Sequence, residues 1–264
     1  RGDLGRQANT LSLLGAIYQH RGQPEEAEQF RRKALDLEQR LGYSIALSHD
    51  ASDLAFTLFF QGKFDEGMEW GQKGLHLSLE HSDPMLEEFA RLAIGWSNLH
   101  LGQYEQAQQE LTRSLALVRV VNNRYDEISV LCSLGYVALV NLSYDKAQAA
   151  FEEGYSLNGT NQFNPYTFNA LSGLGLSACF RGDLDQSRRH FIDLLTEGLR
   201  RKDFLYLLFA LPGLALYLAR RGEVERATTA WALAQRYPFV ANSKWYEDMV
   251  GRELEALAAS MPPE

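Results

Sequence analysis

A motif of seven residues that recurs every 40 residues constrains the fold more than any other feature of this chain. The best-formed copy runs from Leu101 through Gly102 to Ala107, and five further copies begin at Arg21, Gln61, Asn141, Arg181 and Arg221. An acidic residue fills the fifth place and a small residue fills the seventh in every copy. Glycine fills the second place in five copies, with Leu142 as the exception. A period held without slippage along the chain is the signature of a stacked repeat.

Each unit of the repeat predicts two helices. The first helices are predicted at roughly 4–20, 45–60, 85–100, 125–140, 165–180 and 205–220, and the second helices at roughly 24–41, 64–81, 104–121, 144–157, 184–201 and 224–236. Apolar residues recur at spacings of three and four, as in Leu11, Leu14 and Tyr18. Asp83-Pro84 is typical of a helix cap followed by proline at the first helical position.

Small residues occupy one fixed place on each predicted helix. These structural repeat positions are Gly15, Ala55, Gly95, Gly135, Gly175 and Ala215 on the first helices and Ala27, Gly67, Ala107, Ala147, Ser187 and Ala227 on the second helices. Glycine inside a helix costs about 1 kcal/mol relative to alanine, so its recurrence needs a packing reason. The two places lie twelve residues apart across the turn, which predicts two antiparallel helices that cross closely at small side chains.

This pattern resembles the tetratricopeptide repeat. Leucine followed by glycine stands on the first helix, as in Leu14-Gly15 and Leu134-Gly135. A bulky residue follows the small residue of the second helix by four places, although Arg31 and Gly71 depart from this. The bulky residues are Leu111, Phe151, Phe191 and Trp231. The unit is six residues longer than the family's usual 34. This longer unit looks like the C-terminal sensor region of bacterial signal-transduction ATPases with numerous domains (STAND), including the maltose-regulon activator type. HEAT repeats of similar length remain an alternative architecture.

The sequence therefore predicts an all-α fold, a right-handed α-solenoid of about six tetratricopeptide-like helix-turn-helix units. We expect a single domain over residues 1–264, with units at about 4–43, 44–83, 84–123, 124–163, 164–203 and 204–240. A capping helix is expected at about 243–259, because the end of a repeat stack needs a polar outer side. Pro212 falls inside the last predicted first helix and should kink it.

Charge and composition exclude several classes of function. The net charge is −8 and the pI is about 5.4, which argues against direct binding of nucleic acid. No apolar run is long enough to span a membrane, so we expect no membrane contact. Cys132 and Cys179 lie seven places apart in repeat register, which is about 10 Å along a helix and too far for a disulfide. Reduced thiols favour a cytoplasmic location. Because residue 1 is arginine, we expect the chain to be part of a longer protein.

The sequence predicts no catalytic activity, cofactor or metal. No glycine-rich loop ends in Gly-Lys-Ser or Gly-Lys-Thr, so a phosphate-binding loop of that type is excluded. None of the six histidines has the spacing of a zinc ligand pair, and no recognisable nucleophile motif is present. Any ATPase activity would lie in an N-terminal region outside this chain.

The predicted inner wall of the solenoid is rich in aromatic residues. The first helices of such stacks line the concave side, and the candidate ligand- or partner-binding residues there are His49, Ser52, Phe56, Phe60, Phe89, Trp96, His100, Tyr136, Asn169 and Phe180. An apolar surface with a few polar groups is the usual composition of a binding site. Aromatic residues at helical spacing also fill cores, so the alternative is that these rings are simply buried.

Two functions remain open. The resemblance implies a sensor that binds an inducer on the concave face, either a protein, a peptide or a small molecule. It would relay binding through an intramolecular contact with an N-terminal ATPase module, provided that the ligand favours one state over the other. The alternative is a constitutive protein–protein interaction scaffold that holds a peptide or protein in the groove. A clamp for acidic peptide ends is not expected, because the inner places are poor in Lys and Arg, with Arg220 isolated.

Overall fold

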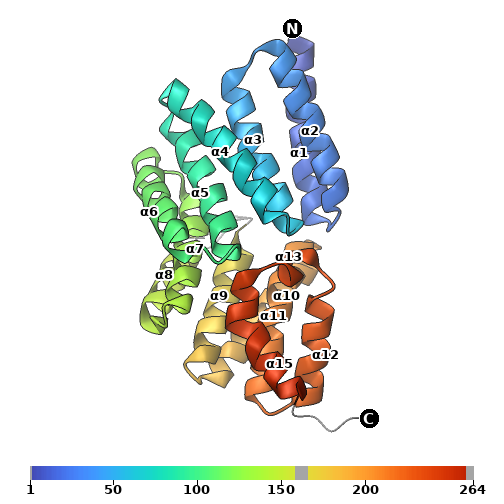
Figure 1. Ribbon diagram of the computed structural model, residues 1–264, viewed down its shortest axis with the longest axis vertical. Helices are drawn as coiled ribbons and strands as arrows, with labels where there is room; N and C mark the ends of the chain where they lie inside the picture. Colours follow the sequence, from blue (N-terminus) through green and yellow to red (C-terminus); the bar gives the residue numbers. More distant parts are fainter. Residues whose placement is uncertain (1, 158–165, 260–264) are drawn as a thin grey trace. The chain divides into compact units, whose positions relative to one another are not determined.

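A computed structural model describes residues 2–157 and 166–259, and all regular elements in these ranges are helical (Figure 1). The paired helices are α1 (Gly2–His20), α2 (Pro24–Leu41), α3 (Ser44–Phe60), α4 (Phe64–His81), α5 (Pro84–His100), α6 (Tyr104–Val121), α7 (Arg124–Val140), α8 (Tyr144–Ser156), α9 (Thr167–Phe180), α10 (Leu184–Arg201), α11 (Phe204–Arg220) and α12 (Val224–Ala234). After them come α13 (Pro238–Ala241), α14 (Lys244–Tyr246), the π-helical segment η1 (Glu247–Gly251) and α15 (Arg252–Ala259). The predicted all-α fold of helix-turn-helix repeats is confirmed.

The chain divides into two compact units, residues 1–126 and 127–264. In the first unit, α1 to α6 pack successively, ending with α5 on α6, and α3 also packs on α5. In the second unit, α8 to α12 pack successively in the same way, α9 packs on α11, and α15 lies against α11 and α12. First helices therefore neighbour one another within a unit, as stacked pairs require. None of the described helices is long and apolar enough to cross a membrane.

The turn inside each pair places one residue in the left-handed region. Five glycines hold this position with φ between 71° and 82°: Gly22, Gly62, Gly102, Gly182 and Gly222. Glycine adopts this backbone conformation without a steric penalty. The sixth copy places Leu142 there, with φ of 54°. The glycine in the repeat motif is therefore required by the shape of the turn.

The turns between pairs also use left-handed residues, which the sequence pattern did not indicate. Gly42, Ser82, Asn122 and Lys202 have φ between 50° and 71° and end the preceding second helix. The predicted cap before α5 is confirmed, because the Asp83 carboxylate accepts hydrogen bonds from two backbone N–H groups of the first turn. Side-chain caps satisfy donors that have no partner inside the helix.

In two of the helix pairs, small residues twelve places apart meet across the pair. A methyl group at Gly67 would lie only 3.1 Å from the carbonyl oxygen of Ala55. The Ser187 hydroxyl donates a 2.8 Å hydrogen bond to the carbonyl oxygen of Gly175. Both pairs are twelve residues apart. The helices approach until side chain meets backbone, which only small residues permit.

The glycine of the first helix also receives the bulky residue of the second helix. Methyl groups at Gly95 and Gly135 would each lie 2.7 Å from side-chain atoms of Leu111 and Phe151, respectively. Arg31 and Gly71, which replace the bulky apolar residue on their second helices, each have a structural reason. Arg31 lies over Gly15 and reaches onward to an acidic residue of α3. Gly71 instead makes room for Ile94 from α5.

Helix α11 of the last pair is less disturbed by Pro212 than the sequence suggested. Helix α11 continues through Pro212 from Phe204 to Arg220 without a break in its assigned helical residues. Proline removes one helical hydrogen bond, yet the residues on either side of Pro212 are buried. Packing therefore holds the helix together at this point.

Replacing Leu142 by glycine should stabilise the protein. A left-handed conformation costs a residue with a side chain about 1–2 kcal/mol, and the Leu142 side chain is 69% exposed, so little packing is lost. After the greater entropy of unfolded glycine is subtracted, we expect Leu142→Gly to raise the free energy of unfolding by about 0.5–1 kcal/mol. Denaturant titration measures this. Leu199→Gly, at an exposed position inside α10, should lower it by about 1 kcal/mol, and a loss of stability in Leu142→Gly would contradict the turn argument.

Filling Gly95 should destabilise the first unit despite the higher helix propensity of alanine. The added methyl group would meet Leu111 at 2.7 Å, and overpacking costs about 1–3 kcal/mol. We expect Gly95→Ala to lower the free energy of unfolding by about 1–2 kcal/mol. In the Gly95→Ala/Leu111→Ala double variant the loss should be smaller than the sum of the two single losses, and strict additivity would argue against this contact.

Candidate functional site

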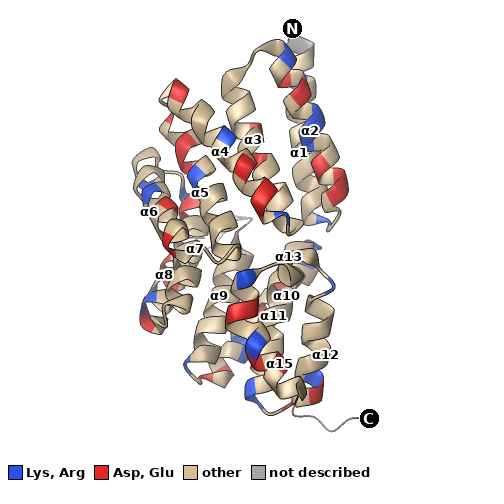
Figure 2. Cartoon of the chain, viewed as in Figure 1, with Lys and Arg blue, Asp and Glu red and all other residues tan. Residues whose placement is uncertain are grey.

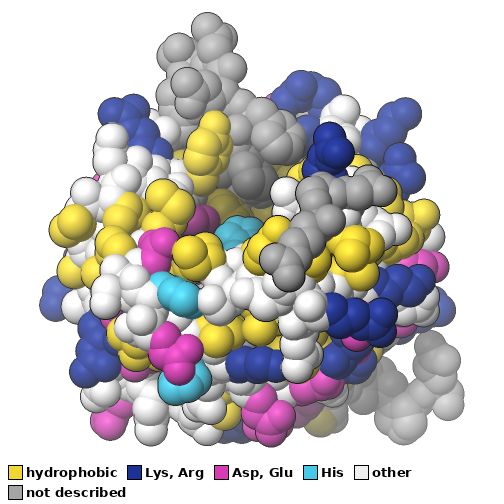
Figure 3. Space-filling model, turned by 90° about the horizontal axis from the view of Figure 1, so that it is seen from above, with side chains coloured by type: hydrophobic (Ala, Val, Ile, Leu, Met, Phe, Trp, Pro, Cys, Tyr) yellow, Lys and Arg dark blue, Asp and Glu magenta, His cyan; other side chains and the backbone are white. Residues whose placement is uncertain are grey.

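Basic and acidic residues alternate along the helices of both units (Figure 2). The face drawn in Figure 3 shows hydrophobic side chains interspersed with basic side chains, acidic side chains and histidines. Nucleic-acid footprints instead gather lysine and arginine along one face.

The predicted inner residues differ in how much solvent they contact. Those that are buried are Ser52, Phe56, Phe60, Trp96, His100, Tyr136 and Asn169. His49 is exposed, whereas Phe89 and Phe180 are half-buried. Their role in binding remains a prediction, but the structure shows that most of them pack against neighbours. The inner face therefore offers few of these side chains directly to a ligand.

In the first unit, the inner aromatic residues form a continuous cluster between α3 and α5. The ring of Phe56 lies 5.0 Å from that of Phe89 and 5.7 Å from that of Trp96. Phe59 lies 4.7 Å from Trp96 and meets the His100 ring edge-on at 4.8 Å. Burial lowers the pKa of His100 to about 3, so this imidazole is neutral at physiological pH. The cluster serves as the core between neighbouring first helices, as the alternative interpretation of the sequence allowed.

In the second unit, the C-terminal segment covers part of the inner face. The indole N–H of Trp245 donates a 3.1 Å hydrogen bond to the carbonyl oxygen of Tyr136, and their rings lie 5.1 Å apart. Phe239 packs on Phe209 of α11 at 5.2 Å. Sequence reasoning missed this contact, although the aromatic residues in the tail were a signal for it. Part of the predicted groove is thus filled by the chain's own side chains.

Asn169 stands next to this covered region with an unsatisfied side chain. It is fully buried, and the Tyr136 hydroxyl donates a 3.1 Å hydrogen bond to its backbone carbonyl oxygen. Neither Oδ1 nor Nδ2 of its amide has a hydrogen-bond partner among the described residues. Buried amides are almost always paired. Asn169 therefore keeps a donor and an acceptor that the described part of the fold does not use.

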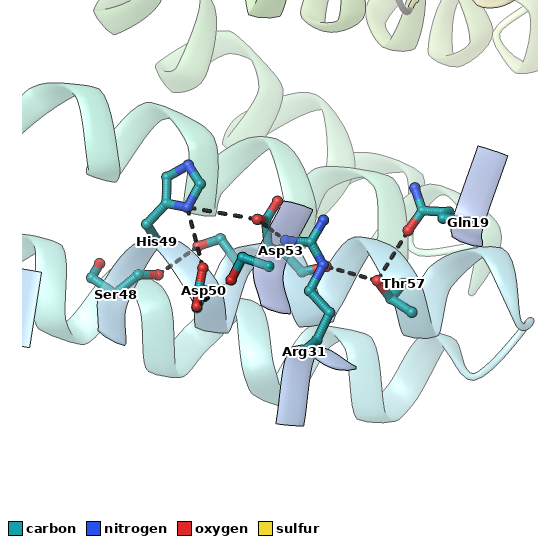
Figure 4. A network of polar contacts seen from close by, with 9 residues as sticks. Gln19, Arg31, Ser48, His49, Asp50, Asp53 and Thr57 are labelled. Atoms are coloured by element: carbon teal, nitrogen blue, oxygen red, sulfur yellow. Dashed lines mark hydrogen bonds and ion pairs between the residues drawn. The ribbon is translucent and has the colours of Figure 1, made fainter. Parts of the chain in front are cut away.

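A polar network in the first unit joins α1, α2 and α3 (Figure 4). The His49 Nδ1 lies 3.6 Å from a carboxylate oxygen of Asp50 and 3.6 Å from one of Asp53. The Ser12 hydroxyl donates a 2.6 Å hydrogen bond to Asp50, and Arg31 forms an ion pair with Asp53. The nearby Asp53 carboxylate raises the pKa of His49 to about 9. His49 is therefore the predicted site residue with the most developed polar environment.

Two further carboxyl groups near this network are buried, and sequence reasoning did not select either of them. Burial raises the pKa of Glu38 to about 8, with the neighbouring Asp50 adding to the shift. Burial likewise raises the pKa of Glu88 to about 9, and Asp126 adds to it. The Asn123 amide donates hydrogen bonds to Glu88 (3.1 Å) and Asp126 (2.6 Å). Both glutamates therefore carry a proton at neutral pH.

A separate cavity of about 300 Å³ lies at the turn between α10 and α11. It is lined by Leu195, Gly198, Leu199, Lys202, Asp203, Phe204, Tyr206 and Leu207. None of the predicted site residues contributes to this lining. The predicted inner face and this cavity are therefore different places on the molecule.

Glu88 should make stability depend on pH. Its folded pKa is raised from 4.5 to about 9, so the folded chain holds a proton that the unfolded chain has released between these values. Stability contributed by this proton is full below about pH 4.5 and is lost as the pH rises towards 9. In Glu88→Gln, the free energy of unfolding should fall less steeply over that range. Between pH 5 and pH 8.5, the variant should lose less of this free energy than the wild type does, by about 1 kcal/mol or more. Chemical denaturation across pH measures this, with the exposed Glu105→Gln as control, and parallel profiles for all three proteins would refute it.

Comparison with known proteins agrees with this geometry. Residues 6–78 match the family model of the tetratricopeptide repeat. No curated protein sequence matches the chain significantly. The fold is similar to that of a Rap protein complexed with Competence and Sporulation Factor, with a TM-score of 0.70 and 12% identity over 97% of this chain and 77% of that one.

Two further solved structures share the fold. Aspartyl phosphate phosphatase F from Bacillus subtilis has a TM-score of 0.68 and 16% identity, over 88% of this chain and 60% of that one. A STAND protein with a tetratricopeptide repeat sensor, from Pyrococcus horikoshii, has a TM-score of 0.55 and 15% identity, over 96% of this chain and 39% of that one. At these identities the likeness concerns the fold alone. Residues 6–78 are thus tetratricopeptide repeats, and the described remainder of the chain continues the same helix-turn-helix fold.

Proposed function

We propose that this protein-interaction domain is the sensor part of a larger cytoplasmic regulator of the STAND type. It binds a peptide or protein ligand on the inner face of its first helices and passes that signal to a switch module elsewhere in the protein. It has no catalytic role of its own. Two neighbours in fold support this proposal, since one is a Rap protein complexed with a factor and the other carries its repeats as a sensor.

The unsatisfied amide of Asn169 is the observation that carries the proposal. Leaving a buried polar group without a partner costs about 1–3 kcal/mol, so a fold that keeps one needs a compensating use. A carboxamide offers one acceptor and two donors, which matches the donor and acceptor of a peptide group. An extended ligand chain could therefore pair with Asn169 through its backbone.

The contact between Trp245 and Tyr136 gives this binding a route to a conformational response. Tyr136 bonds to both Asn169 and Trp245 through its hydroxyl and its carbonyl oxygen, respectively. A ligand that pairs with Asn169 has to enter the region that the C-terminal segment covers. It would then favour a state in which that segment is displaced, and differential affinity of this kind is what a sensor requires.

The second candidate function is a constitutive interaction scaffold without an inducer. The packing of Phe56 and Trp96 into the core of the first unit favours it, because a packed inner face leaves little room for a small molecule. On this reading the partner contacts the exposed His49 and the half-buried Phe89. A stable partner whose binding is indifferent to Asn169 would support the scaffold over the sensor.

Asn169→Ala separates these functions. Removing an unsatisfied buried amide should leave the free energy of unfolding unchanged or raise it by about 1 kcal/mol. The same change should weaken ligand binding by about tenfold, since a hydrogen bond in a dry site is lost. The ligand is first identified by mass spectrometry after co-purification with the full-length protein, and its affinity is then measured by calorimetry. The exposed Asn141→Ala serves as control. A large loss of stability in Asn169→Ala would instead assign the amide a structural role.

A further inference from the structure

We propose that His49, Asp50 and Asp53 on α3 form a binding site for a divalent metal ion, with Zn²⁺ as the best-matched ion. The site lies on the first unit and does not depend on the ligand proposed for Asn169. The sequence alone did not indicate it, because the three residues do not have the spacing of a histidine pair or a cysteine pair.

The donor atoms already have nearly the spacing that a metal ion requires. The His49 Nδ1 is 3.6 Å from oxygens of both Asp50 and Asp53, and the three ligand atoms all lie within 4.8 Å of one another. Donors bound to one zinc ion at about 2.0–2.2 Å in tetrahedral geometry lie about 3.4 Å apart. Small side-chain rotations would therefore bring these three atoms around one ion.

Neighbouring groups hold the prospective ligands in place. The Ser12 hydroxyl bonds to the second carboxylate oxygen of Asp50 at 2.6 Å, which leaves the first oxygen facing His49. The imidazole of His49 stacks on Phe89 with ring centres 5.3 Å apart. Metal ligands are commonly oriented by such surrounding contacts.

A third carboxyl group, on α2, has an unused oxygen next to this cluster. Glu38 is 2% exposed, interacts with Asp50 across the contact between α2 and α3, and leaves its Oε2 without a hydrogen-bond partner. A buried carboxyl oxygen without a partner is unusual. This oxygen lies next to Asp50 but outside the 4.8 Å group of donor atoms formed by His49, Asp50 and Asp53, so it would need a side-chain movement to become a fourth donor.

The two aspartates of the cluster favour a positive charge between them. Asp50 and Asp53 face His49, whose proton a bound ion would displace, and Arg31 pairs with Asp53 from its position over Gly15. Burying carboxylates is costly unless positive charge compensates them. A divalent ion would bind beside Arg31 and share the Asp53 carboxylate with it.

The side chain of His49 is 54% exposed, so an ion can reach the site from solvent. The combination of one imidazole nitrogen with carboxylate oxygens suits Zn²⁺. Ca²⁺ needs six to eight oxygen ligands and Mg²⁺ prefers an octahedral oxygen shell, which this cluster does not supply. We therefore expect selectivity for zinc over calcium and magnesium.

Calorimetric titration of the whole chain with Zn²⁺ tests the site. We expect one ion per chain, no comparable binding of Ca²⁺ or Mg²⁺, and a loss of zinc affinity of at least about tenfold in His49→Gln. His76→Gln is the matched control, because His76 also faces a carboxylate, Glu80, at 3.3 Å but stands exposed on α4 with no further acidic ligand assigned to it. This variant should bind zinc like the wild type.

Three results would overturn the proposal: no zinc binding by the wild type, equal binding by His49→Gln, or an equal loss in His76→Gln. Circular dichroism checks that the His49→Gln variant is folded. If it is not, the visible spectrum of Co²⁺ bound to the wild-type chain provides the second readout, because a tetrahedral site with a nitrogen ligand gives strong absorption and a hydrated surface ion does not. Failure of this proposal leaves the test on Asn169 unaffected.

Discussion

The close crossing of paired helices at small residues is the contact on which the rest of this structure depends. At Gly67 and Ala55, and again at Ser187 and Gly175, a side chain of one helix meets the backbone of the other. At this short distance, the ridge of side chains on one helix fits into the groove of its partner. A bulky residue four places further along, such as Leu111 or Phe151, then fills the space over the glycine of the first helix. The two helices are therefore closely packed on each other, and the apolar surface that remains on the pair is buried by stacking on another pair.

The sequence predicted the helices, their turns and the Asp83 cap well, because the residues that determine them lie within one repeat. The period of 40, the turn glycine and the capping Asp83 act within one unit, so their meaning does not depend on distant residues. The bounds of the twelve paired helices consequently lie within a few residues of the predicted ranges. Even the exceptions obey the same geometry, since Leu142 adopts the positive φ that its place demands.

Contacts between successive helix pairs, and contacts with the C-terminal segment, could not be predicted from the repeat pattern. Arg31 looked like a defect in the pattern, yet its side chain lies over Gly15 and reaches Asp53 in the next pair. Glu38 and Glu88 looked like ordinary charged residues of amphipathic helices, yet both are buried. The contact of Trp245 with Tyr136 joins residues 109 places apart. Such arrangements depend on curvature and on side-chain length, neither of which periodicity encodes.

Both of our proposals place binding at or beside buried polar groups that have no hydrogen-bond partner among the described residues. A repeat protein gains stability from each well-packed interface, so it tolerates a buried amide such as Asn169 or a buried acid such as Glu38. Evolution retains such groups against their cost only where something compensates for it. The aromatic rows hold the first helices together, and under our proposals the polar exceptions Asn169 and Glu38 are the groups that a ligand would pair with. We therefore propose that recognition in this chain depends on the few polar residues that interrupt its apolar packing.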